Sequence, residues 1–470
     1  MENFWGFNVW GTFNLVAVIF LSLILSHTLK TLIPLLSKLL IPTSVLGGII
    51  LLLTSTIYTC ITGLNIFNTN FFGGKGINSL EILTYHALAL GFIAQSLKMS
   101  DKKTTKKRAV EIFNTGVTTV STYILQGIIG LAITIVASLI VTDFFNVAGM
   151  LLPFGYGQGT GQALNYGSIY ENDYGFVGGK SFGLTVAALG FLSASIGGVI
   201  HLNVLKKRGK VFKKISEQDI KKSVKNQVQN DNTINGSIDK MTFQVAFVFI
   251  SYFLAFAVMY TLGLILPNMK ATIYGFNFLF GVLTATFVKV VIKLLNKKQI
   301  IKKQYVDNYL LSKISNLCFD FMVVAGIGAI QTTLIKNYWL ILIILGVVGL
   351  IITYAYNAIV AKILFKEYKD EQFLAMYGML TGTASTGIML LREVDGDFIT
   401  PVADNLVYQN FPAIAFGFPM MLIATLAPKA PIKTLIILGV FFVVMNIILF
   451  RKYLFKKIKS PKTSDKSDAK

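Results

Sequence analysis

Apolar runs recur along nearly the whole chain, and each is long enough to cross a bilayer as a helix. The hydrocarbon core of a bilayer is about 30 Å thick, so a spanning helix needs roughly 20 apolar residues. Unpaired backbone groups in lipid cost several kcal/mol each, so such runs must be helical. We predict about 11 spans. They lie at 9–29, 41–62, 80–98, 109–140, 176–205, 241–266, 272–295, 314–335, 338–363, 405–427 and 431–450.

Two segments interrupt this pattern because they are rich in small polar residues. The first reads LLPFGYGQGTGQALNYGSIYE at 151–171, and the second reads YGMLTGTASTGIMLLREVDGD at 377–397. Non-helical backbone at membrane depth is tolerated only where protein or water surrounds it. Glycine permits sharp turns and close approach of backbones. We therefore do not expect either segment to be a regular spanning helix.

Lysine-rich stretches between the apolar runs predict the orientation of the chain. Short loops rich in Lys and Arg stay in the cytoplasm. All four basic stretches can lie in the cytoplasm only if neither polar segment crosses the membrane. The first segment must then enter and leave the membrane from the outer side, and the second from the inner side. We therefore predict two re-entrant hairpins, near 147–171 and 372–397, with the N-terminus outside and the C-terminus in the cytoplasm. The basic stretches are 98–108, 206–214, 296–303 and 451–459.

The two halves of the chain share one order of spans and hairpin, in opposite predicted orientations. Gly159-Thr160 and Gly382-Thr383 stand at corresponding places, as do GFIAQ at 91–95 and GIGAIQ at 326–331. This pattern is typical of an inverted-topology repeat. We expect an all-α polytopic membrane protein with a glycine-rich hairpin in each half. Its parts would be an N-terminal repeat (1–205), a cytoplasmic linker (206–240), an inverted repeat (241–427), an additional helix (428–450) and a basic cytoplasmic tail (451–470).

Composition narrows the function further. The net charge of +21 could indicate nucleic acid, but the lysines occupy short loops without an aromatic or base-reading pattern, so topology explains them better. Cys60 and Cys318 both lie in apolar runs and offer neither a disulfide framework nor a metal-ligand spacing. Neither hairpin offers paired carboxylates that face a nucleophile. We therefore expect neither an enzyme nor a cofactor.

The hairpins carry the candidate chemistry. Broken helices that meet near the bilayer midplane expose N-termini that suit a carboxylate, while carbonyl and hydroxyl oxygens suit a hard cation. Small polar residues can also serve helix packing alone. We predict a substrate site from Gln158, Gly159, Thr160, Gly161, Gln162, Asn165, Thr383, Ser385, Thr386 and Arg392. We predict sodium ligands among Thr381, Gly382, Asp404, Asn405 and Asp320.

Two of these predictions have an open alternative. Arg392 could hold a carboxylate with its planar fork, or it could pair with Glu393, Asp395 or Asp397 beside it. Asp320, near the start of its expected span, could bind a cation or carry a proton. Ionisable residues are scarce within the other spans, and proton-coupled carriers generally need them there. The coupling ion is therefore expected to be Na⁺.

The first half of the chain resembles the glutamate:sodium symporter family of bacteria. The likeness rests on LIPTSVLGGIILLL at 40–53, PFGYGQGTGQALNYGSIYENDYGF at 153–176 and GLTVAALGFLSASIGGVIHLNVLKKR at 183–208. The resemblance implies sodium-coupled uptake of glutamate across the bacterial inner membrane, with 158–162 and 381–386 in the translocation site. The second half is more charged than the glutamate carriers, so a different organic anion stays open as the substrate.

A channel is the alternative from another functional class. Gly155-Tyr156-Gly157 resembles a potassium filter, but such a filter needs four-fold repetition and the second hairpin lacks the triplet. The reading that we favour is a symporter of glutamate or a related small carboxylate, working by alternating access. As partners we expect a small anionic substrate, Na⁺, anionic membrane lipids and a second copy in a homodimer, but no nucleic acid.

Overall fold

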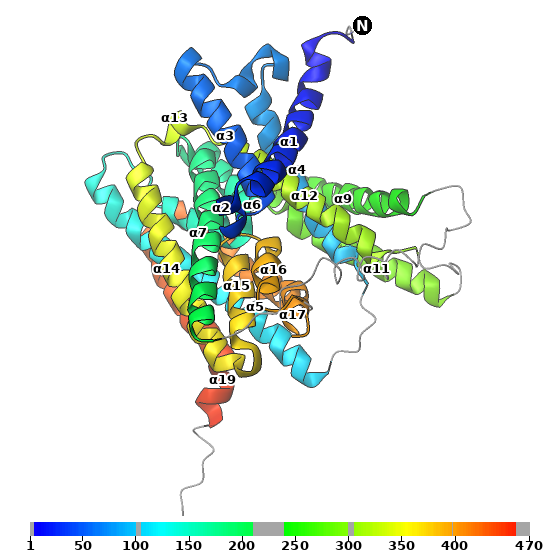
Figure 1. Ribbon diagram of the computed structural model, residues 1–470, viewed down its shortest axis with the longest axis vertical. Coiled ribbons are helices and arrows are strands. Elements are labelled where there is room, and N and C mark those ends of the chain that lie inside the picture. Colours follow the sequence, from blue (N-terminus) through cyan, green and yellow to red (C-terminus); the bar gives the residue numbers. More distant parts are fainter. Residues whose placement is uncertain (1–3, 100–104, 210–238, 299–304, 397, 457–470) are drawn as a thin grey trace, which may run out of the picture.

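The computed structural model describes residues 4–99, 105–209, 239–298, 305–396 and 398–456. Regular structure in these ranges is helical throughout, and 11 helices are long and apolar enough to span a membrane (Figure 1). The prediction of an all-α polytopic membrane protein is confirmed. In the first half the spanning helices are α1 (Phe7–Leu32), α3 (Thr43–Thr62), α4 (Gly76–Leu97), α5 (Lys106–Ile140) and α7 (Gly179–Lys207). In the second half they are α9 (Lys240–Ile265), α11 (Asn277–Lys297), α12 (Asn308–Gly328), α14 (Trp339–Leu364), α18 (Asn410–Leu426) and α19 (Pro431–Lys456).

Most helices agree with the expected spans, but α12 begins and ends earlier than 314–335. Asp307 caps its first turn, since the carboxylate accepts hydrogen bonds from the backbone N–H groups of Tyr309 and Leu310. As a result Asp320 lies near the middle of α12 and not near one end. The side chain is exposed and hydrogen-bonds Ser44.

Three other expectations differ from the structure or fall outside it. The expected span 405–427 is divided into α17 (Val402–Tyr408) and α18. The helix expected at 428–450 continues as α19 to Lys456, so the predicted tail begins as helix, and the rest of the tail lies outside the described residues. Most of the predicted linker, 210–238, also lies outside them.

The first hairpin is α6 (Leu151–Tyr174), whose two arms lie side by side. Gly159 alone is non-helical in this stretch, with φ 78° and ψ −170°. Phe154 on one arm stacks on Tyr166 on the other, with ring centroids 3.6 Å apart. Just outside the arms, Phe145 stacks on Phe176 with centroids 4.8 Å apart. The chain therefore reverses direction at Gly159.

The second hairpin consists of α15 (Lys369–Leu380) and α16 (Ala384–Arg392). Its tip is the non-helical stretch 381–383. The arms approach closely because glycines face each other: a methyl group on Gly378 would lie 2.9 Å from Gly387 Cα. Small residues at such crossings let helix backbones come into contact.

Helix α7 relates the two hairpins. It begins at Gly179, beside the open end of the first hairpin, where a methyl on Gly179 would lie 2.8 Å from Gly167 O. Near its other end His201 Nε2 is 4.0 Å from Asp370 Oδ1, at the start of the second hairpin. The hairpins thus open toward opposite ends of α7. Their re-entry from opposite faces of a bilayer stays a prediction.

The contacts between helices of the two halves occur in matching pairs. Helix α3 contacts α12, and α11 contacts α4; likewise α5 contacts α18, and α14 contacts α7. A twofold relation between the halves would produce such pairs, so the contacts support the inverted repeat, which itself stays a prediction.

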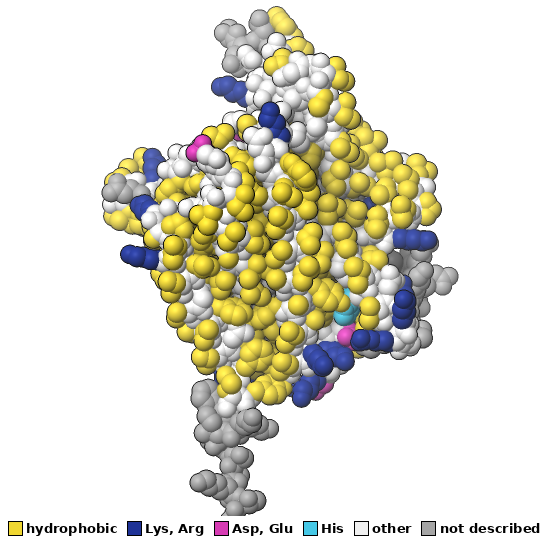
Figure 2. All heavy atoms as spheres, turned by 90° about the vertical axis from the view of Figure 1, so that its left-hand side faces the viewer, with side chains coloured by type: hydrophobic (Ala, Val, Ile, Leu, Met, Phe, Trp, Pro, Cys, Tyr) yellow, Lys and Arg dark blue, Asp and Glu magenta, His cyan; other side chains and the backbone are white. Residues whose placement is uncertain are grey.

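One face of the molecule is almost continuously apolar, with Lys and Arg mainly toward its lower end and sides (Figure 2). Exposed apolar side chains on α14 and α19, such as Val347, Ile351, Val440 and Val443, suit contact with lipid tails. The predicted homodimer and the predicted contacts with anionic lipids stay predictions.

Candidate functional site

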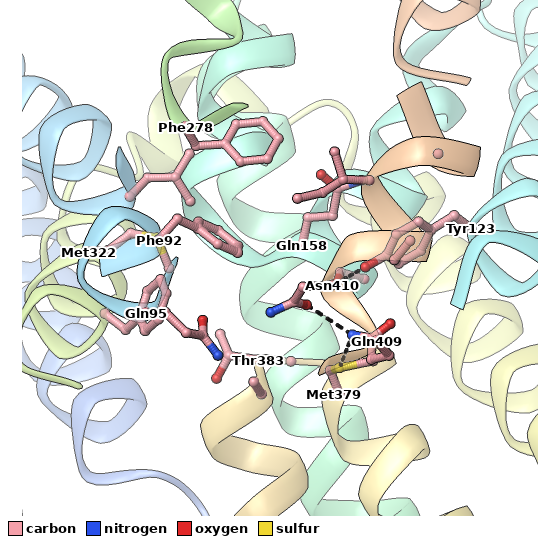
Figure 3. Close-up of a pocket in the computed structure, with 18 of the residues that line it drawn as sticks. Phe92, Gln95, Tyr123, Gln158, Phe278, Met322, Met379, Thr383, Gln409 and Asn410 are labelled. Carbon is pink, nitrogen blue, oxygen red and sulfur yellow. Dashed lines mark hydrogen bonds between the residues drawn. The ribbon is translucent and has the colours of Figure 1, made fainter. Parts of the chain in front are cut away.

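A cavity of about 100 Å³ lies where the tips of the two hairpins meet (Figure 3). A methyl group on Gly159 would lie 3.4 Å from Thr383 Cγ2 and 3.7 Å from Gly382 O, so the tips are in contact. Aromatic and methionine side chains form much of the wall, including Phe92, Phe278, Phe319, Met322 and Met379. The polar side chains that line the cavity are Gln95, Tyr123, Gln158, Thr383, Gln409 and Asn410.

Helix ends give this neutral cavity its electrostatic character. The second arm of α6 begins at Thr160 and α16 begins at Ala384, so two helix N-termini start at the tips. Helix N-termini carry unpaired N–H groups and a partial positive charge, which favour anions. Two C-termini, at Gln158 and Leu380, bring carbonyl oxygens to the same place. No charged side chain is among the described residues that line the cavity.

Hydrogen bonds fix the orientation of several lining groups. Gln409 Nε2 donates to Asn410 Oδ1 (3.0 Å) and to Met379 Sδ (3.3 Å), while its own oxygen accepts from Thr119 Oγ1 (2.9 Å). Because Asn410 Oδ1 accepts this bond, the amide nitrogen of Asn410 can donate to another group. Figure 3 shows this nitrogen directed toward the Gln95 side of the cavity. Tyr123 Oη donates to Gly157 O at 2.9 Å.

Of the predicted substrate residues in the first hairpin, Gln158 lines the cavity and Gly159 forms its turn. Thr160 is fully buried and donates to Met322 O at 3.0 Å. Asn165 Nδ2 donates to Gly275 O at 3.1 Å, and Gly161 packs against Leu88. The Gln162 amide is buried with no partner among the described residues.

The second hairpin divides its predicted residues in a similar way. Gly382 and Thr383 line the cavity, and the hydroxyls of Thr383 and Thr386 are 3.4 Å apart. Thr381 is buried and donates to Tyr377 O at 2.6 Å. Ser385 is exposed. Roles for all predicted residues of both hairpins stay predictions.

Arg392 lies at the exposed far end of α16, where its guanidinium stands 5.5 Å from the centre of the Phe398 ring. It does not line the cavity. Among the residues that the structure describes, it makes no ion pair with Glu393 or Asp395, and Asp397 lies outside them. Both sequence-based roles for Arg392 therefore stay predictions.

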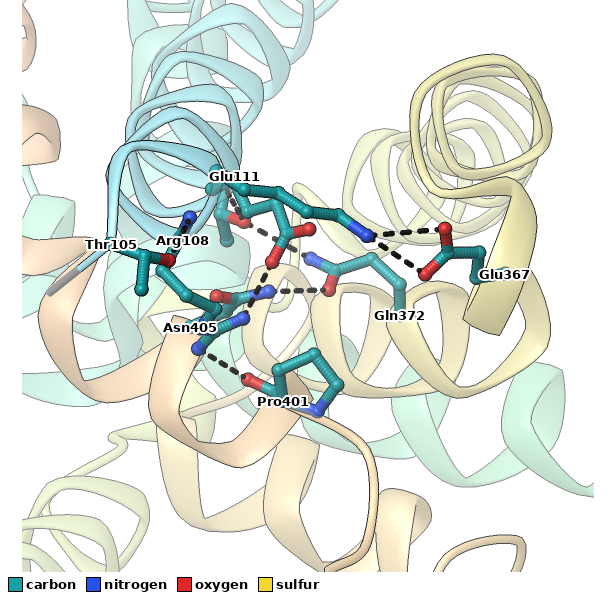
Figure 4. Close-up of polar contacts among 9 residues, drawn as sticks. Thr105, Arg108, Glu111, Glu367, Gln372, Pro401 and Asn405 are labelled. Atoms are coloured by element: carbon teal, nitrogen blue, oxygen red, sulfur yellow. Dashed lines mark hydrogen bonds and ion pairs between the residues drawn. The ribbon is translucent and has the colours of Figure 1, made fainter.

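The predicted sodium ligands of α17 belong to a polar network away from the cavity lining (Figure 4). Asn405 is fully buried and donates to Gln372 Oε1 at 3.3 Å, and Gln372 donates to Thr115 Oγ1 at 3.3 Å. Nearby, Arg108 pairs with Glu111 at 2.6 Å. Asp404 is partly buried in the same helix.

A second group of neutral oxygens lies at the crossing of α5 and α14, beside the end of α15. Gln126 Nε2 donates to Thr353 Oγ1 (2.8 Å) and to Leu380 O (3.0 Å), and Asn357 Nδ2 donates to Thr353 O (2.9 Å). Both amides are buried, yet Gln126 Oε1 and Asn357 Oδ1 have no partner among the described residues. A buried polar atom left unpaired costs about 1–3 kcal/mol. Two such oxygens next to a helix C-terminus are the kind of group that binds Na⁺ in broken-helix carriers.

The sequence analysis missed four lining residues: Gln95, Tyr123, Gln409 and Asn410. Gln95 and Tyr123 share long helices with other polar residues, and Gln409 and Asn410 stand side by side at the start of α18, so the sequence does not show which of these side chains face the cavity. A signal did exist for Gln95, which ends the GFIAQ stretch that recurs between the halves.

The fold and the cavity define a polytopic helical carrier whose two broken helices meet at a neutral, amide-lined site. The model of the sodium/glutamate symporter family matches residues 8–398. Because this match covers most of the chain, the protein belongs to that family of sodium-coupled transporters. The comparison with curated proteins found no match. The family resemblance predicted from the sequence is confirmed.

Part of the cavity lies beyond the matched residues. Gln409 and Asn410, together with the α18 residues Ala413 and Met421, follow residue 398 and still line the site. The family match alone would not have pointed to these two amides.

Proposed function

We propose that the protein is a sodium-coupled symporter of glutamate or a related small carboxylate, and that it works by alternating access. One observation carries the proposal: two hairpin tips meet at a cavity lined by amides and by two helix N-termini. Helix N-termini and amide N–H groups bind a carboxylate without a lysine or arginine. A neutral site also explains the need for a cation, because bound Na⁺ supplies the missing positive charge.

Sodium would be held by oxygens next to this cavity. Gln126 Oε1 and Asn357 Oδ1 are buried and unpaired among the described residues, and Leu380 O lies beside the Gln126 amide. Together with the hydroxyls of the hairpin tips, they form the best supply of neutral oxygens near the site. Binding of Na⁺ there would order the second tip and favour entry of the anion.

Alternating access is supported by an asymmetry between the two ends of the cavity. Toward the first hairpin, an ion pair joins α4, α6 and α7: Lys180 Nζ lies 2.9 Å from Glu81 Oε2 and 3.7 Å from Glu171 Oε1. Toward the other side, the cavity adjoins a larger hollow that shares Phe92 and Asn410 with it. A carrier accessible from one side only has this arrangement.

Uptake into proteoliposomes tests the proposal. Purified protein is reconstituted with potassium inside, and radiolabelled L-glutamate is added with sodium outside. We expect accumulation that depends on the sodium gradient and disappears when a sodium ionophore dissipates it. A proton gradient without sodium should not drive uptake. Protein-free liposomes are the control.

Competition then separates the two readings of the substrate. Unlabelled aspartate, 2-oxoglutarate and citrate are added in excess, and the strongest competitor identifies the preferred carboxylate. Uptake driven equally by potassium or protons would contradict sodium coupling. No uptake of any carboxylate on the panel would contradict the transport proposal as a whole.

A further inference from the structure

A second hollow, of about 240 Å³, adjoins the cavity on the side of the lysine-rich helix ends. The two spaces share Phe92, Gln95, Asn410 and Ile414 as lining residues, so they lie side by side. Their electrostatics differ sharply. Among the described residues that line the cavity none is charged, whereas Lys98, Lys289 and Lys293 line the hollow. Among the described residues, no carboxylate lines it.

Lys289 is the most informative of the three, because it stands within the spanning helix α11. A lysine inside a span is rare and usually functional. Its ammonium donates to Ser96 O at 2.6 Å and reaches Lys98 O at 3.5 Å, so it is tied to the end of α4. It also lies 5.8 Å from the centre of the Phe411 ring. These partners are all neutral, so the charge of Lys289 is not cancelled by them.

The other two lysines, Lys98 and Lys293, add to the positive charge around the hollow. Lys98 follows the last residue of α4, and burial lowers the pKa of its ammonium. Lys293 is one helical turn from Lys289 on α11. Burial next to like charge disfavours the ammonium form. An anion in the hollow would therefore be stabilised by all three lysines and would in turn stabilise their charge.

We propose that this hollow is a second, weaker binding site for the small carboxylate substrate, a basic vestibule between the cavity and the lysine-rich end of the protein. This proposal rests on the proposed transport function. It adds a second position on the transport path at which the substrate binds. Field focusing in a cleft of one charge raises the local concentration of oppositely charged ligands and their rate of arrival. The described residues that line the hollow do not include the two hairpin tips, so the anion is held less tightly there than in the cavity and can also leave it.

The vestibule is tested first by a measurement that does not depend on transport. Cys60 and Cys318 are replaced by serine, and Lys293→Cys provides a single reporter thiol. The protein is reconstituted in neutral phosphatidylcholine and treated with an anionic or a cationic methanethiosulfonate of similar size. We expect the anionic reagent to react about 10-fold faster, because Lys98 and Lys289 remain. Excess L-glutamate should slow it.

Two variants make the reporter specific. Lys289→Met should lower the anionic-to-cationic ratio about 5-fold, whereas Lys289→Arg keeps the charge and should keep the ratio. Lys297→Cys is the matched reporter, since it is about 12 Å along α11 from Lys289 and does not line the hollow. Charges in physiological salt are screened over about 8 Å, so Lys289→Met should hardly change the anionic-to-cationic reaction ratio of a thiol at position 297.

A transport measurement then connects the vestibule to the carrier. With substrate offered from the lysine-rich side, Lys289→Met should raise KM about 10-fold, while KM from the opposite side stays unchanged. If wild-type protein transports no carboxylate, the transport proposal fails, and the reporter ratio still tests the vestibule. A ratio near one, or a ratio insensitive to Lys289→Met, overturns the vestibule. Protection by phosphatidylglycerol and not by glutamate also overturns it, because the lysines would then bind lipid headgroups.

Discussion

The two hairpins reach the same cavity, but they are anchored in different ways. Nearly all of the first hairpin is buried, and three tyrosines of its second arm donate hydrogen bonds to backbone carbonyls of α18. These bonds join Tyr166 to Met421 O (2.9 Å), Tyr170 to Ala424 O (2.8 Å) and Tyr174 to Thr425 O (2.9 Å). In the second hairpin a longer tip, 381–383, is non-helical, and Gln126 donates to Leu380 O just before it.

This difference assigns the hairpins different roles in a carrier. Three hydrogen bonds, each worth about 1 kcal/mol, hold the first hairpin against α18, and the stacked pair of Phe154 and Tyr166 holds its two arms together. The tip of the second hairpin packs on α7 at Gly190 and Phe191, and its one bond to a side chain of α5 among the described residues is the bond of Leu380 O with Gln126, next to the candidate sodium ligands. From this contrast we infer a fixed first tip and a second tip whose position responds to Na⁺.

The largest effect is expected at the turn of the first hairpin. Gly159 has φ 78° and ψ −170°, a region that only glycine adopts readily, and a side chain there costs about 1–3 kcal/mol. A methyl on Gly382 would crowd Thr386 Oγ1 at 2.9 Å, but no positive φ is required there. Each increase of about 1.36 kcal/mol in the activation free energy lowers a rate about tenfold. We expect Gly159→Ala to reduce initial uptake up to about 100-fold and Gly382→Ala about 10-fold.

These rates are normalised to the amount of folded protein measured by size-exclusion chromatography. Gly439→Ala is the matched control, because no heavy atom lies within 4 Å of the added methyl. An equal loss in both tip variants, or a greater loss in Gly382→Ala, would contradict the idea of a fixed first tip.

A smaller but more specific effect is expected at the anchor of the second tip. Gln126→Met retains side-chain length and removes the unpaired Oε1 as well as the bond to Leu380 O. If this oxygen binds Na⁺, the sodium concentration for half-maximal uptake should rise about 10-fold, equivalent to about 1.4 kcal/mol. The measurement is uptake over a range of external sodium at saturating glutamate.

Gln244→Met provides the comparison for this variant. Gln244 is another fully buried glutamine, but its amide donates to Tyr305 O and its oxygen accepts from the Asp307 N–H. Its replacement should lower stability without changing sodium dependence. A loss of stability alone in Gln126→Met would remove Gln126 from the sodium site and leave it as a structural anchor.

The sequence predicted the fold better than the site, and the reason is physical. Runs of about 20 apolar residues identify spans almost independently of their neighbours. Glycine-rich interruptions pointed to the two segments in which the structure has the turn at Gly159 and the non-helical stretch 381–383, while their re-entry and their role as a site stay predictions.

The remaining walls of the cavity depend on which face of a helix points inward. Gln95 and Gln126 share their helices with other polar residues and Asn410 directly follows Gln409, so hydrophobic periodicity does not show which of these side chains point inward. Nearness in sequence also differs from nearness in space: Arg392 is close to the second tip along the chain, yet α16 places it about 13 Å away along the helix axis. Tertiary packing decides such positions.

The smallest effect is expected from the tyrosine anchors of the first hairpin. Tyr166→Phe removes the bond to Met421 O but keeps the ring that stacks on Phe154. We expect a loss of about 1 kcal/mol in stability and less than about a twofold change in uptake, because the hydroxyl lies outside the cavity lining and the first tip remains anchored by Tyr170 and Tyr174. Thermal unfolding of the purified protein measures the loss, with the exposed Tyr260→Phe as control. A marked fall in uptake at unchanged stability would show that the hydroxyl takes part in transport, and the first hairpin would then be a moving part as well.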